Sequence, residues 1–90
     1  MSLHRRAAKR DQNESQIVAA LSAAGATVVQ LSAAGCPDLL VGARGRTFLL
    51  EVKAANGKLT PDQLEWHRNW QGYPVKVVRS IEDALAAIGA

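Results

Sequence analysis

The chain has 90 residues, of which 48% are hydrophobic and 21% are charged, and it contains one cysteine. A chain of this length builds a single hydrophobic core, so we expect one domain rather than several. No segment reaches the roughly 18 apolar residues of a membrane span, and one cysteine cannot form an internal disulfide, so we expect an intracellular protein.

The net charge of +3 is concentrated at the N-terminus, where the first ten residues hold four basic side chains and no acidic one. These are Arg5, Arg6, Lys9 and Arg10. We therefore divide the chain into a basic N-terminal arm, residues 1–10, and one domain, residues 11–90. Such an arm is typical of a segment that contacts nucleic-acid phosphates, although a solvated terminus has the same composition.

The first half of the domain predicts one helix and three strands. Apolar residues recur at helical spacing over residues 11–24, where Asp11 or Asn13 can cap the helix and Gly25 can end it. Residues 26–31 are rich in β-branched side chains and predict a strand. Two further strands, residues 38–42 and 47–53, flank a short connection that contains a glycine, which predicts a β-hairpin.

The second half predicts two helices separated by a strand. Thr60, Pro61 and Gln63 have the spacing of a capping box with proline at the first helical position, and the helix should end near Gln71. Residues 75–79 predict a fourth strand, and Ser80 can cap a last helix.

The resulting order, α-β-β-β-α-β-α, predicts an α/β fold in which helices flank a mixed sheet. The hairpin strands should be antiparallel. The last strand follows a helical crossover, so it should be parallel to its neighbour.

Three charged residues interrupt the apolar strands. Asp38 opens the second strand, and Glu51 and Lys53 lie near the end of the third. Alternation places Glu51 and Lys53 on one face, and the hairpin brings Asp38 toward Glu51. Converging carboxylates repel unless a cation lies between them, and oxygen ligands suit Mg²⁺ or Mn²⁺ rather than zinc. The pattern therefore predicts a divalent metal site beside a lysine.

Each feature also has a purely structural explanation. An aspartate at a strand start is commonly a turn residue, and a Glu-x-Lys pair is commonly solvated. Glu14 lies on the apolar face of the first predicted helix, where it approaches a positive group or complements the helix dipole. Gln63 closes the capping box. His67 has no Cys or His at ligand spacing, so we do not expect it to bind a metal.

The combination resembles a known nuclease family. Residues 35–41 (GCPDLLV), the EVK triplet at 51–53, and then Gln63 and Trp66 resemble the VRR-NUC branch of the PD-(D/E)XK superfamily. The resemblance covers residues 14–81 and implies a restriction-endonuclease-like core. It also implies a stand-alone protein like the Holliday junction resolvases, working in the cytoplasm of a bacterium or of a phage-infected host cell.

The resemblance implies roles for individual residues. Asp38 and Glu51 match the carboxylate metal ligands, with the backbone carbonyl of Val52 as a further ligand. Lys53 matches the lysine beside the attacking water. Gln63 and Glu14 match the helix glutamine and the first-helix acid, which makes Glu14 an additional candidate ligand. These residues form the expected catalytic set, with Mg²⁺ or Mn²⁺ as cofactor.

The function implied is a metal-dependent endonuclease that hydrolyses DNA phosphodiester bonds, directed to branched DNA such as four-way junctions and acting as a homodimer. The alternative is a catalytically silent module of the same fold that binds DNA or a protein. His67 is another candidate for contact with DNA, whereas Trp66 and Trp70 are expected to pack on the sheet rather than stack on bases. The candidate phosphate contacts are Arg5, Arg6, Lys9, Arg10, Arg44, Arg46, Lys58 and Arg68.

Overall fold

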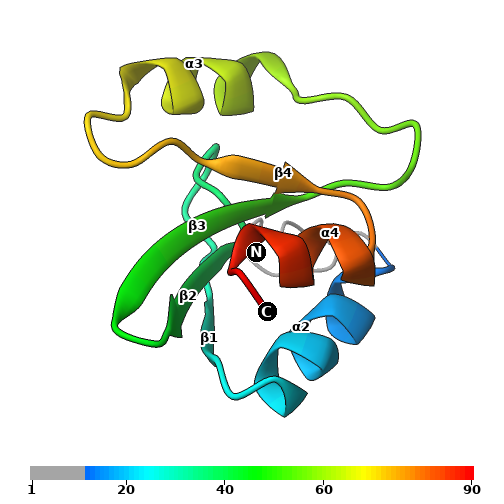
Figure 1. Ribbon diagram of the computed structural model, residues 1–90. Coiled ribbons are helices and arrows are strands. Elements are labelled where there is room, and N and C mark those ends of the chain that lie inside the picture. Colours follow the sequence, from blue (N-terminus) through cyan, green and yellow to red (C-terminus); the bar gives the residue numbers. More distant parts are fainter. Residues whose placement is uncertain (1–11) are drawn as a thin grey trace.

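A four-stranded mixed sheet forms the centre of the molecule in the computed structural model, which describes residues 12–90 (Figure 1). The strands lie in the order β1-β2-β3-β4. The first two pairs of neighbours are antiparallel and β3 and β4 are parallel, so the expected hairpin and the expected parallel last strand are both confirmed. The strands are β1 (Thr27–Gln30), β2 (Leu39–Ala43), β3 (Arg46–Val52) and β4 (Lys76–Val78).

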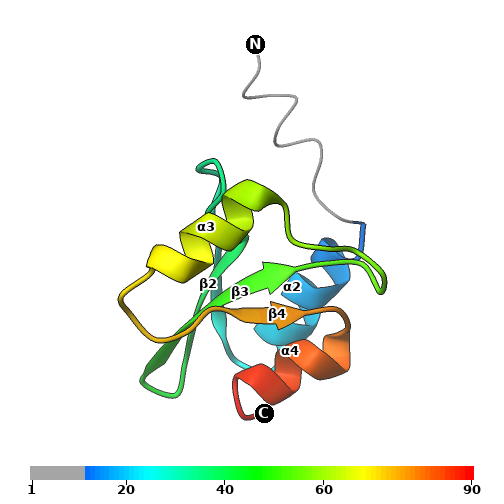
Figure 2. The same ribbon diagram turned by 90° about the horizontal axis from the view of Figure 1, so that it is seen from above.

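The helices cover the two faces of the sheet unequally. Helices α2 (Glu14–Ala23) and α4 (Ile81–Ala87) lie together on one face, and α3 (Pro61–Asn69) lies on the other (Figures 1 and 2). The order α-β-β-β-α-β-α is therefore confirmed. Within residues 12–90, no helix is long and apolar enough to span a bilayer. The basic arm lies outside the described residues.

The hydrophobic core lies between the sheet and the pair α2 and α4. Side chains alternate along β2, where Leu39 and Val41 are fully buried while Leu40 is 36% exposed on the opposite face. Strand β3 alternates in the same way up to Leu50, but beyond it Glu51, on the opposite face, is buried as well. The buried apolar residues are Ile17, Leu21, Leu39, Val41, Ala43, Phe48, Leu50, Val52, Val78, Ala84 and Ile88.

The β2–β3 connection is a two-residue turn whose geometry matches the twist of the hairpin. Arg44 and Gly45 both have positive φ, 51° and 79°, the conformation that two-residue hairpin loops favour. Arg44 is strained there because it carries a Cβ. Its guanidinium donates a hydrogen bond to the carbonyl of Ile88, which fastens the turn to the end of α4.

Helix α3 ends at Asn69, two residues before the expected end at Gln71. Trp70 leaves the helical conformation, with φ −70° and ψ 124°, and its indole Nε1 donates to the Tyr73 carbonyl at 2.9 Å. The indole also lies against Gly72, where a Cβ would approach the ring to 2.8 Å. The packing of Trp70 on this turn therefore ends the helix before the glycine is reached.

Two adjacent leucines test the assignment of the core face. Leu39→Ala should lower the free energy of unfolding by about 2–5 kcal/mol, because it leaves a cavity in the core. Leu40→Ala should lower it by well under half as much, since that side chain already contacts water. Chemical denaturation of the parent and both variants gives the comparison. Equal losses, or a larger loss for Leu40→Ala, would show that the two faces have been assigned wrongly.

Candidate active site

The hairpin register places Asp38 beside the end of β3. Leu39 pairs with Leu50, so Asp38 stands opposite Glu51, one step beyond the strand. Opposed residues of an antiparallel pair have Cβ atoms about 4.5–5.5 Å apart. The Asp38 carboxylate oxygen Oδ2 accepts a hydrogen bond of 2.7 Å from the backbone amide of Val52. The Asp38 carboxylate therefore lies against the backbone between Glu51 and Lys53.

Glu51 is fully buried, and side chains of α3 donate to its carboxylate. Gln63 Nε2 donates to Oε2 at 3.2 Å, and His67 Nε2 lies 3.0 Å from Oε1. A buried carboxylate is costly unless hydrogen bonds replace its lost hydration. The face of α3 that carries Gln63 and His67 supplies such bonds.

The Gln63 amide makes two kinds of contact at once. Its Oε1 accepts from the Thr60 backbone amide at 2.9 Å, while Thr60 Oγ1 accepts from the Gln63 backbone amide at 3.2 Å. These bonds form the expected capping box. The other end of the same amide, Nε2, is left to donate to Glu51. The start of α3 and the surroundings of Glu51 are therefore joined through one side chain.

The contact of His67 with Glu51 was not predicted from the sequence. Burial, and secondarily the positive charge of Lys53, lower the pKa of His67 from its ordinary value of 6.5. The imidazole is therefore neutral at pH 7, and its contact with Glu51 is a hydrogen bond from Nε2–H rather than an ion pair. The available signal was its spacing of four residues from Gln63, which puts both on one helical face.

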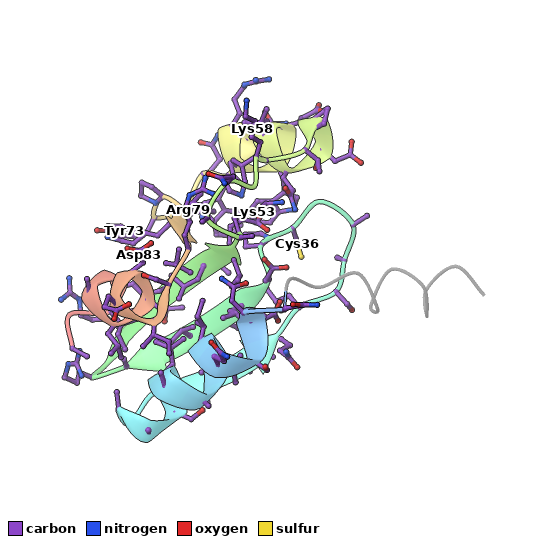
Figure 3. The ribbon with its side chains drawn as sticks, turned by 90° about the vertical axis from the view of Figure 1, so that its right-hand side faces the viewer. Cys36, Lys53, Lys58, Tyr73, Arg79 and Asp83 are labelled. Atoms are coloured by element: carbon purple, nitrogen blue, oxygen red, sulfur yellow. The ribbon has the colours of Figure 1, made fainter. Side chains whose placement is uncertain are left out.

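Lys53 follows β3 directly and is half-buried. Its backbone amide donates to the Val78 carbonyl at 3.0 Å, which continues the parallel pairing with β4. Figure 3 shows Lys53 between the end of the sheet and α3. Lys53 lies on the same side of the sheet as Glu51, as alternation along a strand requires.

Glu14 is the second buried carboxylate among the described residues, with 2% of its surface exposed. Its Oε2 accepts a hydrogen bond of 2.9 Å from Gln30 Nε2, which ties the first turn of α2 to the end of β1. The apolar helical face predicted for Glu14 is thus buried. Its contribution to a metal site stays a prediction.

The candidate phosphate contacts lie in different places. Lys58 and Arg68 are exposed, before and on α3. Arg44 and Arg46 lie at the hairpin turn, and five residues of strand put Arg46 about 17 Å from Glu51. Arg44 is also held by the end of α4. The arm residues Arg5, Arg6, Lys9 and Arg10 lie outside the described part of the chain.

The expectation that both tryptophans pack on the sheet is wrong. Trp66 and Trp70 stack on each other, with ring centroids 5.0 Å apart and planes 19° from parallel. Trp70 is 41% exposed, and neither ring belongs to the core. Trp70 has left the helical conformation, and its ring stacks on Trp66 near the C-terminal end of α3. There they line an open groove with Ala34, Asp62, Glu65 and Asn69.

Comparison with known proteins identifies the family. One solved structure, described as a VRR_NUC domain, matches with a TM-score of 0.68 and 30% sequence identity. The match covers 89% of this chain and 100% of that chain. The chain belongs to the VRR-NUC family. Membership of this family supports a nuclease-type function. No protein-family model matches the sequence, and neither does any curated protein.

The donor atoms of this VRR-NUC domain suit a hard divalent cation. Within residues 12–90, no three His, Cys, Asp or Glu side chains are grouped as metal ligands, as a closed zinc site would need. Mg²⁺ is commonly held by one or two carboxylates and completes its shell with water and substrate phosphate. Asp38 and Glu51 are two carboxylates of this kind, opposed across the β2–β3 hairpin.

The hydrogen bond from His67 to Glu51 can be tested by stability. His67→Ala should lower the free energy of unfolding by about 1–3 kcal/mol, because Glu51 Oε1 loses its donor in a buried position. Arg68→Ala, the neighbouring exposed residue, should change it by less than about 0.5 kcal/mol. Denaturant unfolding at pH 7.5 gives both values. An unchanged stability for His67→Ala would show that the contact contributes nothing.

Proposed function

We propose that the protein is a metal-dependent endonuclease that hydrolyses phosphodiester bonds of DNA. The observation that carries this proposal is the hydrogen bond from the Val52 amide to Asp38, at 2.7 Å. It holds one carboxylate against the backbone segment that joins Glu51 to Lys53. Membership of the VRR-NUC family supports the nuclease chemistry.

Asp38, Glu51 and the Val52 carbonyl would hold Mg²⁺ or Mn²⁺ in this mechanism. When bound, such an ion polarises a phosphoryl oxygen and lowers the pKa of a coordinated water. The two carboxylates would supply negative charges that hold the ion. Gln63 and His67 donate to Glu51 and fix the direction in which its carboxylate points. Glu14 is an additional candidate ligand.

Lys53 provides a positively charged side chain at the proposed site. Its ammonium group holds the attacking water for in-line displacement and stabilises negative charge developing on the phosphate. No Ser-His or Cys-His nucleophile is needed, because water attacks directly. Asp38, Glu51 and Lys53, with Gln63 and Glu14, are therefore the proposed catalytic set.

The proposed substrate is branched DNA, with four-way junctions as the leading case. The 90 residues contain no zinc-finger pattern or other base-reading motif, so we expect phosphate contacts and DNA shape to direct binding. Lys58 and Arg68 are exposed cations before and on α3, the helix that contacts Glu51, and Arg44, Arg46 and the basic arm extend the set. His67 is a further candidate contact.

The proposed working form is a homodimer. Exposed aliphatic side chains lie on the sheet face opposite α2 and α4, which α3 covers only in part: Val29 is 47% exposed, Leu40 36% and Val77 37%. The strand pairing puts Val29 next to Leu40. A second copy that covered these side chains would bury apolar surface that a 90-residue chain cannot cover alone. Two sites related by a twofold axis suit two paired strands of a junction.

Cleavage assays test the proposed chemistry. The parent should cut a four-way junction with Mg²⁺ or Mn²⁺ and not with EDTA. Asp38→Asn and Lys53→Met should each slow cleavage by at least about 100-fold, because each removes a charge that acts in the transition state. Glu65→Gln, which alters an exposed carboxylate on α3, should cleave at the parental rate.

A binding measurement separates the enzyme from the silent module. Mn²⁺ should raise the melting temperature of the parent, and Asp38→Asn should lose most of that increase. A parent that binds the junction but neither cuts it nor responds to Mn²⁺ would favour the silent DNA-binding module. Equal cleavage by the parent and by Asp38→Asn would point to a contaminating nuclease.

The salt dependence of binding tests the phosphate contacts. The combined variant Lys58→Ala and Arg68→Ala should reduce the slope of log Kd against log salt by about 1 to 2, since two phosphate contacts are lost. Lys76→Ala removes a charge from β4 and should leave the slope unchanged. Fluorescence anisotropy with labelled junction and linear duplex, in EDTA, gives both slopes. Tighter binding to the linear duplex would overturn the preference for branched DNA.

A further inference from the structure

Arg79, which follows β4, holds the loop that comes directly after Lys53. Its Nη1 donates to the carbonyls of Gly57 at 2.7 Å and Ala54 at 2.8 Å, and lies 3.4 Å from that of Ala55. One guanidinium therefore fixes three carbonyls within four consecutive residues. Such a group acts as a clamp on the backbone, although the Arg79 side chain is itself exposed.

The backbone of Arg79 is itself fixed on both sides. Its amide donates to Asp83 Oδ2 at 2.9 Å, in the first turn of α4. Its carbonyl accepts from Asn13 Nδ2 at 3.3 Å, at the start of α2. The clamp is thus anchored to both helices that cover the core. Figure 3 shows Arg79, Asp83 and Lys53 at this end of the molecule.

Asn13 makes a second contact that reaches Lys53 directly. The same Nδ2 donates to the Lys53 carbonyl at 3.2 Å. Asn13 is the N-cap residue of α2, but its side chain makes no capping hydrogen bond. Its amide nitrogen is directed to the carbonyls of Lys53 and Arg79, while its oxygen, the atom that caps a helix, is buried without a partner.

The clamped loop also packs against the side chain of Lys53. A Cβ added to Gly57 would lie 3.6 Å from Lys53 Cδ, so the loop backbone covers the aliphatic part of that side chain. A lysine has four rotatable bonds and an ammonium group that moves freely unless its stem is packed. Fixing both the backbone and the stem leaves few positions for the ammonium.

We propose that Arg79 and Asn13 are positioning residues that hold the Lys53 ammonium where the attacking water is bound. This inference rests on the proposed nuclease function and extends it to two residues that do not contact the substrate. Arg79 acts through the loop 54–57, and Asn13 acts through the Lys53 carbonyl. Release of either contact lets the lysine stem move, and a displacement of about 1 Å lowers turnover steeply.

The first test is a double-mutant cycle on junction cleavage with Mg²⁺. Arg79→Met should lower kcat about 10- to 100-fold while KM changes by less than about twofold. In the Lys53→Met background, Arg79→Met should cause no further loss, because the residue acts only through that lysine. A merely structural role would lower both rates by the same factor.

Two further variants serve as a control and as an independent test. Lys76→Met removes the same charge three residues earlier, from β4, and should retain parental kcat. Asn13→Ala should lower kcat about 10-fold with unchanged KM, because its lost bonds end at Lys53 and Arg79. If thermal unfolding shows that Arg79→Met does not fold, the kcat of Asn13→Ala tests the positioning role by itself. Hydrogen exchange at the Gly57 amide, which donates to the Ala54 carbonyl, should be faster in Arg79→Met.

The outcomes distinguish this inference from the proposed function. If the parent cleaves DNA and Lys53→Met does not, the function stands and the cycle tests the positioning role. A parental kcat in both Arg79→Met and Asn13→Ala, when both fold, would then overturn the inference. So would a loss of kcat from Arg79→Met that is equally large in the parent and in the Lys53→Met background. If Lys53→Met cleaves like the parent, the proposed role of the lysine fails, and the positioning role fails with it.

Discussion

The pairing of β2 with β3 is the constraint on which the rest of the molecule depends. A single register sets which side chains enter the core and which face α3, because a slip of one residue would exchange the two faces. The same register sets Asp38 opposite Glu51 and allows the Val52 amide to reach the Asp38 carboxylate. The two-residue turn at Arg44 and Gly45 fixes that register. Folding and site geometry are thus decided by the same hairpin.

The buried carboxylate of Glu51 depends on hydrogen bonds from α3. A carboxylate with no exposed surface is unfavourable in an apolar layer, and α3 compensates with the amide of Gln63 and the imidazole of His67. Helix α3 itself buries no residue completely. Its place on the sheet therefore depends in part on these polar contacts. An element held in this way adds little to the core but determines the surroundings of the carboxylate.

Local patterns in the sequence predicted most of the fold, because the turns, caps and strand alternation are encoded by neighbouring residues. The capping box at Thr60 and the left-handed Gly25 were predictable for this reason. Contacts between distant residues were not. The bond from Asn13 to Lys53 spans 40 positions, and that from Arg79 to Ala54 spans 25. The early end of α3 was missed because the packing of Trp70 overrides the helix-ending signal of Gly72.

The shared amide of Gln63 carries a consequence for how this helix can vary. Its oxygen completes the start of α3 while its nitrogen reaches a carboxylate in the interior. A glutamate there would preserve the cap but set a second negative charge against Glu51, and a shorter amide would lose the reach. Position 63 is therefore restricted to glutamine, because one end of the amide must cap the helix and the other must donate to Glu51.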